Sequence, residues 1–221
     1  MLSILVIIAP NALIAGNLAQ DDTVKVKHID KLPVIDGLAD DECWSKADWQ
    51  SIDQFWVKYG EELDSTDFSG RYKIMWSSES NLLYYLIEVT DDAFIDGWPD
   101  VPGDYYAFDI IEIFLDQDRS GGLHVFDGTG SVGEQWGTNA ENAFSYHINI
   151  DLPTEGEFTS ECVVNDIAGT DWGDRWFPNY AGHFPEIALR EYQGKYYWEF
   201  SLIVYNDTYY HPLPEYSRVV M

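Results

Sequence analysis

Residues 109–127 read DIIEIFLDQDRSGGLHVFD and begin with the clearest strand of the chain. From Ile110 to Leu115, apolar side chains fill most positions of both alternating sets, which is typical of a strand buried on both faces. Glu112 is the exception. Burying an unpaired carboxylate is costly, so we expect Glu112 to face a groove, a cation or a polar ligand.

The second half of this stretch has the spacing of a calcium loop. Asp116, Asp118, Ser120 and Gly121 hold positions 1, 3, 5 and 6, and Asp127 holds position 12. No helical pattern flanks the loop, so it is not a helix–loop–helix calcium site. The pattern predicts calcium ligands at Asp116, Asp118, Ser120 and Asp127, but Asp, Ser and Gly are also the usual residues of a plain hairpin turn. Both interpretations stay open.

The composition limits the partners. The 221 residues include 12 Lys and Arg and 39 Asp and Glu, for a formal net charge of −27. Such an acidic surface repels phosphate, which argues against nucleic acid and anionic membranes. Nine Trp and 15 Tyr are more aromatic side chains than a core of this size needs, and these rings stack on ligands and anchor interfaces.

The first 19 residues differ from the rest. Leu2 to Ala9 is a continuous apolar run, and small residues follow up to Ala19, which predicts a secretory leader over 1–19. The run is too short and too broken to span a membrane. We therefore expect a single domain over 20–221 that is secreted, periplasmic or at the cell surface, with a buried N-terminal segment as the alternative.

The two cysteines allow two interpretations. Outside the cytoplasm Cys43 and Cys162 would be able to form a disulfide. Each is equally compatible with a small buried core residue. No Cys/His spacing of a zinc site is present.

The remaining pattern is that of an all-β protein. Strands recur without long helices between them, which predicts an antiparallel two-sheet β-sandwich of jelly-roll type. One short N-terminal helix is expected over residues 40–47. The predicted strands are 23–29, 70–77, 82–90, 110–115, 144–151, 161–164, 186–191 and 195–204.

Several short motifs follow one another in a definite order. They are PVIDG at 33–37 with Trp44 and Ala47, YKIMW at 72–76, LYYLIEVTD at 83–91, the D-x-x-E-x-x-x-D strand 109–116, and WEFSLI at 198–203. Together they resemble family 9 carbohydrate-binding modules over nearly all of residues 25–205. The resemblance implies an extracellular, non-catalytic β-sandwich that binds a poly- or oligosaccharide. It also implies calcium as a cofactor of some members and a linked or associated glycoside hydrolase.

The sequence departs from the family pattern in two places, at the C-terminal end and at the second ring of the sugar site. The family continues past the strand that ends near Tyr205 with a further strand, so we expect a domain truncated at its C-terminus or ending unusually. The best-understood members hold a sugar between two Trp rings. Trp98 lies in the loop that would supply the first ring, and no residue here matches the second.

The predicted sugar site has an aromatic platform and a polar rim. A pyranose offers an apolar C–H face and a rim of hydroxyls, so it needs both. The candidates are Trp98, Tyr105 and Tyr106 for the platform, and Arg71, Glu112, Asn142 and His147 for the rim. Each has a purely structural alternative, and Trp136, Trp172 or Trp176 would also serve as a platform.

Other classes of function have weaker signals. No nucleophile, zinc-protease or phosphate-loop motif is present, and with so many carboxylates a pair at glycosidase spacing arises by chance. A haem-binding electron-transfer module of related fold would use Met75 and His147 as axial ligands. A calcium-stabilised structural or surface-attachment domain is the third class.

Overall fold

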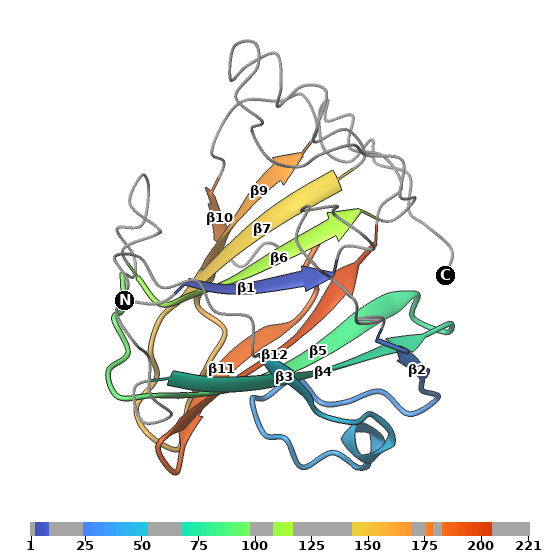
Figure 1. The fold of residues 1–221 in the computed structure, drawn as a ribbon, viewed down its shortest axis with the longest axis horizontal. Coiled ribbons are helices and arrows are strands. Elements are labelled where there is room, and N and C mark those ends of the chain that lie inside the picture. The colour runs from blue at the N-terminus through green and yellow to red at the C-terminus, as the bar shows by residue number, and fades with distance from the viewer. Residues whose placement is uncertain are drawn as a thin grey trace, which may run out of the picture.

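The computed structural model describes residues 3–8, 24–52, 68–97, 108–116, 143–168, 176–178 and 183–204. Two β-sheets lie face to face (Figure 1). Sheet A has the order β1 (Ser3–Ile8), β6 (Ile110–Asp116), β7 (Ala143–Ile150), β9 (Cys162–Ala168) and β10 (Trp176–Pro178). Sheet B has the order β2 (Lys27–His28), β4 (Phe68–Ser77), β5 (Leu82–Asp91), β12 (Lys195–Ile203), β11 (Ile187–Tyr192) and β8 (Phe158–Thr159), with β3 (Gln50–Ile52) beside β4.

The predicted all-β sandwich is confirmed, with differences in detail. Among the described strands the pairs are antiparallel except β1–β6 and β2–β4, which are parallel. The expected helix over 40–47 is a five-residue 3-10 helix, η1 (Glu42–Lys46). Its N-cap residue Asp41 makes no side-chain capping bond, and five residues is a short length typical of 3-10 helices.

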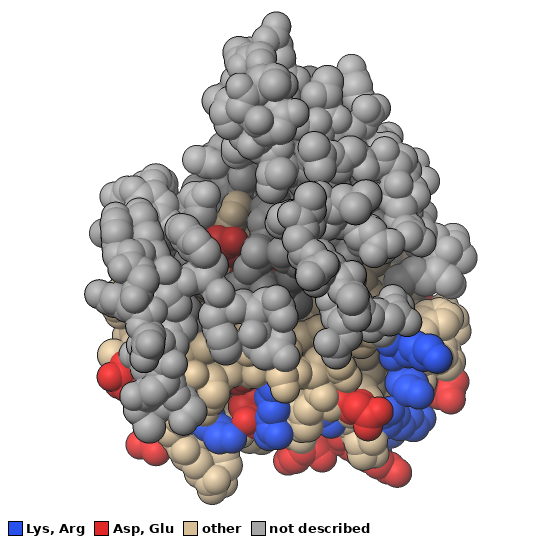
Figure 2. All heavy atoms as spheres, in the orientation of Figure 1, with Lys and Arg blue, Asp and Glu red and all other residues tan. Residues whose placement is uncertain are grey.

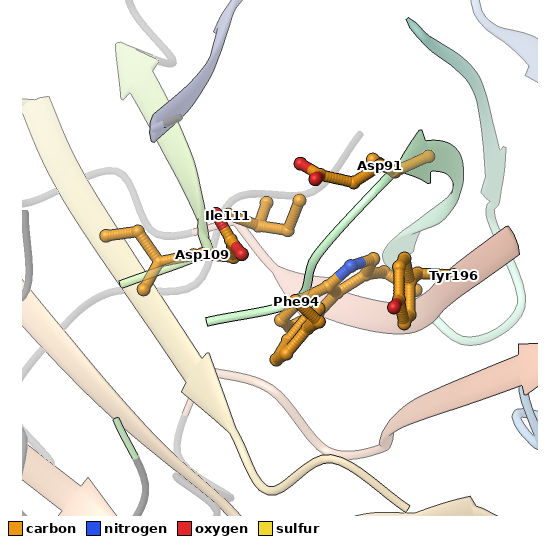
Figure 3. A pocket seen from close by; sticks show the side chains of 8 residues that line it. Asp91, Phe94, Asp109, Ile111 and Tyr196 are labelled. Atoms are coloured by element: carbon orange, nitrogen blue, oxygen red, sulfur yellow. The ribbon is translucent and has the colours of Figure 1, made fainter. Parts of the chain in front are cut away.

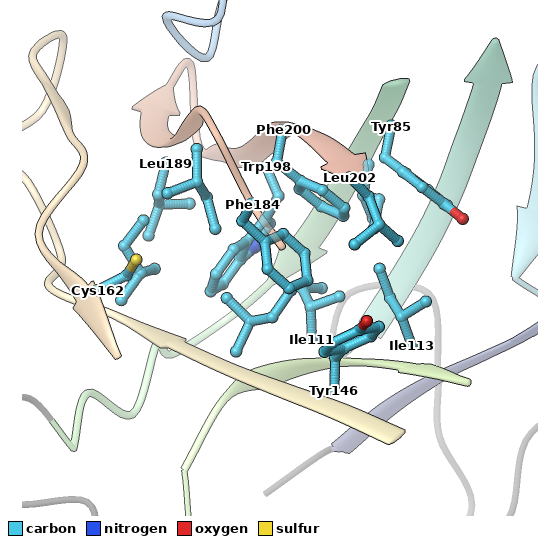
Figure 4. Close-up of a cluster of buried hydrophobic side chains, with 14 of the residues drawn as sticks. Tyr85, Ile111, Ile113, Tyr146, Cys162, Phe184, Leu189, Trp198, Phe200 and Leu202 are labelled. Atoms are coloured by element: carbon cyan, nitrogen blue, oxygen red, sulfur yellow. The ribbon is translucent and has the colours of Figure 1, made fainter. Parts of the chain in front are cut away.

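The main core lies between the sheets (Figure 4). Tyr85 stacks on Phe200 with ring centroids 4.9 Å apart, and Tyr146 meets Phe184 edge to face at 5.0 Å. Alternate residues of β6 and β7 face these rings, because successive side chains of a strand point to opposite faces. The β6 and β7 residues in the main core are Ile111, Ile113, Leu115, Tyr146, Ile148 and Ile150.

A second core covers the outer face of sheet B. The segment between β2 and β3, with η1, packs over that face and is seen below the sheet in Figure 1. Trp44 is 1% exposed here, and its indole Nε1 donates to Glu199 Oε1 at 2.7 Å. Glu199 Oε2 accepts from the backbone N–H groups of Asp36 (3.1 Å) and Gly37 (3.0 Å). The PVIDG motif, residues 33–37, is therefore a strap fastened to sheet B by one buried carboxylate.

The cysteines are both free and buried. Cys43 belongs to the second core and Cys162 to the main core, so they lie on opposite faces of sheet B. The disulfide interpretation is wrong, and the two thiols are core residues. Burial raises the pKa of the Cys43 thiol, with the nearby Asp41 carboxylate acting in the same direction.

The N-terminal residues pair with the central strand. β1 runs parallel to β6, from Ser3 opposite Ile110 to Ile8 opposite Leu115. Removal of a leader over 1–19 would leave β6 at the edge of sheet A. The leader and the domain limits 20–221 stay predictions. In the described part of the chain, no helix has the length and apolar character needed to cross a membrane.

Candidate functional site

Three polar residues share the outer face of sheet A. On β6 the residues on either side of Glu112 belong to the main core, so Glu112 faces outward. The same alternation on β7 places His147 and Asn149 on the outer face. We call Glu112, His147 and Asn149 the polar row. Since β6 and β7 are adjacent, these side chains belong to one continuous surface.

The first two members of the polar row lie directly opposite each other. Glu112 and His147 are register partners across β6 and β7. His147 Nε2 is 3.8 Å from Glu112 Oε1, which is an electrostatic contact when the imidazole is protonated but too long for a hydrogen bond. Their side chains are 5% and 14% exposed. The pair is thus shielded from bulk water. Electrostatic and hydrogen-bonding interactions are stronger in such a shielded place than in water.

No lysine or arginine of sheet A offsets the Glu112 charge. The described Lys and Arg residues belong to sheet B, to the segment over it or to the residues just before β2, and Lys and Arg mix with Asp and Glu on the face seen in Figure 2. Burial raises the pKa of the Glu112 carboxyl to about 7. The group therefore changes charge near neutral pH, where an ordinary glutamate is fully ionised.

The raised pKa predicts a pH dependence of stability. Because the folded pKa of Glu112 exceeds the ordinary value of 4.5, its contribution is fully present below pH 4.5 and is lost as the pH rises through 7. This loss is about 3 kcal/mol. We expect Glu112→Gln to make the free energy of unfolding fall less between pH 4.5 and 8, in urea titrations at a series of pH values. Equal slopes for both proteins would contradict the raised pKa.

The predicted sugar residues divide into three groups. Glu112 and His147 come together, as the sequence predicted for a shared rim. Arg71 is on β4 of sheet B, where its Nη2 donates to Glu88 Oε2 at 2.7 Å and its guanidinium lies 4.2 Å from the centroid of the Trp49 ring. Arg71 is therefore separated from the polar row by the thickness of the sandwich. The remaining candidates Trp98, Tyr105, Tyr106 and Asn142 lie outside the described residues.

The calcium loop is almost entirely outside the described residues. Asp116 ends β6, and only its backbone is described, while Asp118, Ser120 and Asp127 fall beyond it. Within the described ranges no group of three or more His, Cys, Asp or Glu residues is arranged to hold a metal ion. Calcium binding by the loop stays a prediction.

The haem alternative is wrong because its two ligands are on opposite sides of the sandwich. Met75 is fully buried in the second core, on the outer face of sheet B. His147 lies on the outer face of sheet A. Two axial ligands must approach one iron from either side of a single haem plane, and here both sheets lie between them.

A small pocket marks where β6 begins (Figure 3). The rings of Phe94 and Tyr196 lie on one side of it, with centroids 4.9 Å apart, and Asp109 lies on the other. Asp109 Oδ2 accepts from the backbone N–H of Ile95 at 2.5 Å, and its own N–H donates to the Ile95 carbonyl at 3.0 Å. Asp109, the first acid of the D-x-x-E motif, therefore has a structural role, because it holds the backbone of Ile95 beside the start of β6.

With this geometry in place, the sequence comparison is decisive. Residues 35–205 match the family model described as "Carbohydrate family 9 binding domain-like". The chain belongs to this family. The match runs from within the strap to just past β12, so it includes most of both cores of the family 9 domain and the polar row on its outer face. The predicted family is confirmed.

Solved structures of a family 9 carbohydrate-binding module from Caldicellulosiruptor kristjanssonii are similar to this family 9 domain. The complex with cellotriose is 18% identical, with a TM-score of 0.43 over 80% of this chain and 67% of that one. The complex with glucose is 17% identical, with a TM-score of 0.46 over 80% of this chain and 66% of that one. No curated protein matches the sequence.

Proposed function

We propose that this family 9 domain binds carbohydrate and does not catalyse a reaction on it. The observation that carries the proposal is the Glu112–His147 pair, placed on the outer face of sheet A in a chain of a carbohydrate-binding family. Polar groups that are gathered on one face and shielded from bulk water are suited to hold the hydroxyls of a ligand.

The chemistry of the pair fits a sugar rim. An ionised Glu112 accepts hydrogen bonds from sugar hydroxyls, and charged acceptors form the stronger bonds. The His147 imidazole either donates or accepts, so it complements a hydroxyl in either role. Trp98, Tyr105 and Tyr106 are our candidates for the ring platform under the apolar face of the sugar. The platform is part of the proposal and rests on the sequence alone.

The neighbours of Glu112 favour binding over hydrolysis. A glycosidase needs a second carboxylate across the scissile bond. The residues opposite Glu112 on the two adjacent strands are Leu5 and His147, and neither is acidic. Among these described neighbours Glu112 has no second carboxylate, an arrangement that suits holding a ligand better than acid–base catalysis.

The wider context is also proposed. The apolar run at residues 2–9 supports secretion, and the acidic composition suits a surface outside the cell. A domain that only binds sugar would keep an associated or linked glycoside hydrolase close to its polysaccharide substrate. Calcium held by the loop after Asp116 would stabilise the folded domain, because a ligand that binds only the folded state adds to its stability.

A tryptophan-fluorescence titration of the full chain tests the proposal. The ligands are glucose and cellotriose first, then xylo- and manno-oligosaccharides, each with calcium and with a chelator. We expect a saturable change with at least one sugar. Glu112→Ala should weaken that binding at least tenfold, because loss of a hydrogen bond to a charged group costs about 1.5–3 kcal/mol.

The matched control is Arg71→Ala, on the opposite outer face of the sandwich. It should leave sugar affinity unchanged. A tenfold loss with Arg71→Ala and none with Glu112→Ala would move the site to sheet B. No response of the wild-type chain to any sugar, with or without calcium, would overturn carbohydrate binding and favour a structural domain.

A further inference from the structure

A group of exposed aromatic rings lies on the other side of the sandwich, on the outer face of sheet B. Phe158 on β8 and Tyr192 on β11 are 48% and 45% exposed, although both carry large apolar surfaces. Arg190 belongs to the outer face, because Leu189 before it belongs to the main core. Tyr192 follows Arg190 by two residues, and Phe158 is the register partner of Arg190, so both rings share that face.

Two residues of β12 complete this surface. Tyr197 is opposite Arg190, and Lys195 is opposite Tyr192. We call Phe158, Arg190, Tyr192, Lys195 and Tyr197 the ring patch. Directly opposed residues have Cβ atoms about 4.5–5.5 Å apart and diagonal neighbours about 7–8 Å apart, so the three rings surround Arg190 at close range. Tyr197 also packs against the second core, so the patch borders the part of sheet B that this core covers.

The patch is ordered by Arg190 and leaves room beside Tyr192. The Arg190 guanidinium lies 5.3 Å from the centroid of the Phe158 ring, and its Nη1 donates to the Gly156 carbonyl. The register of β8 and β11 places Gly156 opposite Tyr192. In the described part of the chain no atom lies within 4 Å of a Cβ added to Gly156. Open space is therefore left next to the Tyr192 ring, where a ligand is able to approach the backbone.

The charges of the patch are already paired, which favours an uncharged ligand. Lys195 Nζ is 2.6 Å from Glu88 Oε1, and Arg190 Nε and Nη1 both donate to backbone carbonyls. A chain with a net charge of −27 also repels an anionic ligand. Two further donors remain on the Lys195 ammonium, and the Tyr192 hydroxyl, which accepts from Gln193 Nε2 at 3.1 Å, keeps its own proton to donate. Exposed rings with donors beside them suit a neutral ligand rich in hydroxyls.

We propose that the ring patch is a second carbohydrate-binding site, which holds a neutral oligosaccharide chain on the outer face of sheet B. The apolar C–H faces of sugar residues stack on Tyr192 and Phe158, and sugar hydroxyls accept from Lys195. This inference rests on the proposed sugar-binding function. The polar row and the ring patch lie on opposite outer faces of the sandwich, so a short sugar reaches only one of them. One domain is then able to bridge two polysaccharide chains.

Isothermal titration calorimetry of the full chain with cellohexaose, xylohexaose and mannohexaose tests this proposal. We expect two sites per chain for at least one of these hexasaccharides. Replacing both exposed rings, Phe158→Ala together with Tyr192→Ala, should weaken one site at least tenfold and leave the other unchanged, because the stacking surface of only one site is lost. Glu112→Ala should do the reverse. The chain with all three substitutions should bind weakly at both sites.

Two control variants separate ring stacking from a general loss of apolar surface. Tyr192→Phe keeps the ring, so it should weaken the second site by no more than about threefold, the effect of one ordinary hydrogen bond. Val34→Ala removes apolar surface from the strap, where Val34 is 65% exposed and outside the ring patch, and it should leave both sites unchanged. The melting temperature of the double ring variant should fall by no more than about 4 °C, since both rings are exposed.

Three outcomes would overturn the inference, and they are distinguishable. One site per chain in the wild type, unaffected by the double ring variant, would overturn the second site and leave the proposed function standing. A wild-type dimer in sedimentation velocity that the double ring variant dissociates would mean that the rings bind a second copy of the chain. Failure of the wild type to bind any of the hexasaccharides or shorter sugars would overturn the proposed function as well.

Discussion

Glu199→Ala is expected to lower the free energy of unfolding by about 3–5 kcal/mol. The carboxylate is fully buried and accepts from the indole of Trp44 and from the backbone N–H groups of Asp36 and Gly37. Alanine leaves all three donors buried without an acceptor, and it leaves a cavity beneath the strap. Urea denaturation at pH 8 measures the loss.

Glu186→Ala is the control for this prediction. Glu186 is exposed and immediately precedes β11 in the same sheet, so the same substitution there should change stability by no more than about 0.5 kcal/mol. Glu199→Gln should fall between the two, because one of its oxygens is retained as an acceptor. Equal, small effects for Glu199→Ala and Glu186→Ala would mean that the strap does not depend on this carboxylate.

Gly37→Ala is expected to cost about 3–4 kcal/mol for two separate reasons. Gly37 has φ +73°, where a side chain is strained, and an added Cβ would lie 2.7 Å from Arg190 Cβ and 3.1 Å from its backbone N. Arg190 is not able to move away freely, because its Nε donates to the Asp36 carbonyl at 3.0 Å and its Nη1 to the Gly156 carbonyl. Thermal and urea denaturation measure the cost.

Gly194→Ala separates the two causes. Gly194 has nearly the same φ, +72°, but no atom lies within 4 Å of an added Cβ. It should therefore cost only the strain of the left-handed conformation, about 1–2 kcal/mol. The difference between the two variants is the cost of close approach to β11. Equal costs for the two substitutions would contradict the close approach of the strap to β11 that the structure shows.

Both large effects concern the strap, which sequence reasoning identified only as a family motif. The PVIDG residues and Trp44 were visible in the sequence, but their common partner Glu199 lies more than 150 residues further along the chain. In the sequence Glu199 is one charged residue within a strand of alternating pattern. Nothing local distinguishes it from a solvated glutamate, because its burial arises only when the strap folds over sheet B.

The sequence predicted the positions of some residues of the candidate site but not of others. The cost of burying an unpaired carboxylate predicted that Glu112 would face a groove, a cation or a polar ligand, and the structure places it on the outer face of sheet A. His147, another predicted rim residue, lies opposite Glu112 on the adjacent strand. Arg71 belongs to the other sheet, and a strand pattern does not state which sheet a strand joins. Asn149 was not singled out, because sequence alternation does not show that an outward-facing side chain is buried.

The sequence by itself determined the all-β class, the strand through Glu112 and the family to which the chain belongs. These follow from local periodicity and from short motifs whose order is preserved along the chain. Only the tertiary structure decided that Glu112 lies opposite His147 on adjacent strands and that Arg71 lies on the far side of the sandwich. Strand register and the packing of one sheet on another depend on contacts between residues far apart in the chain, and alternation within a strand does not encode them.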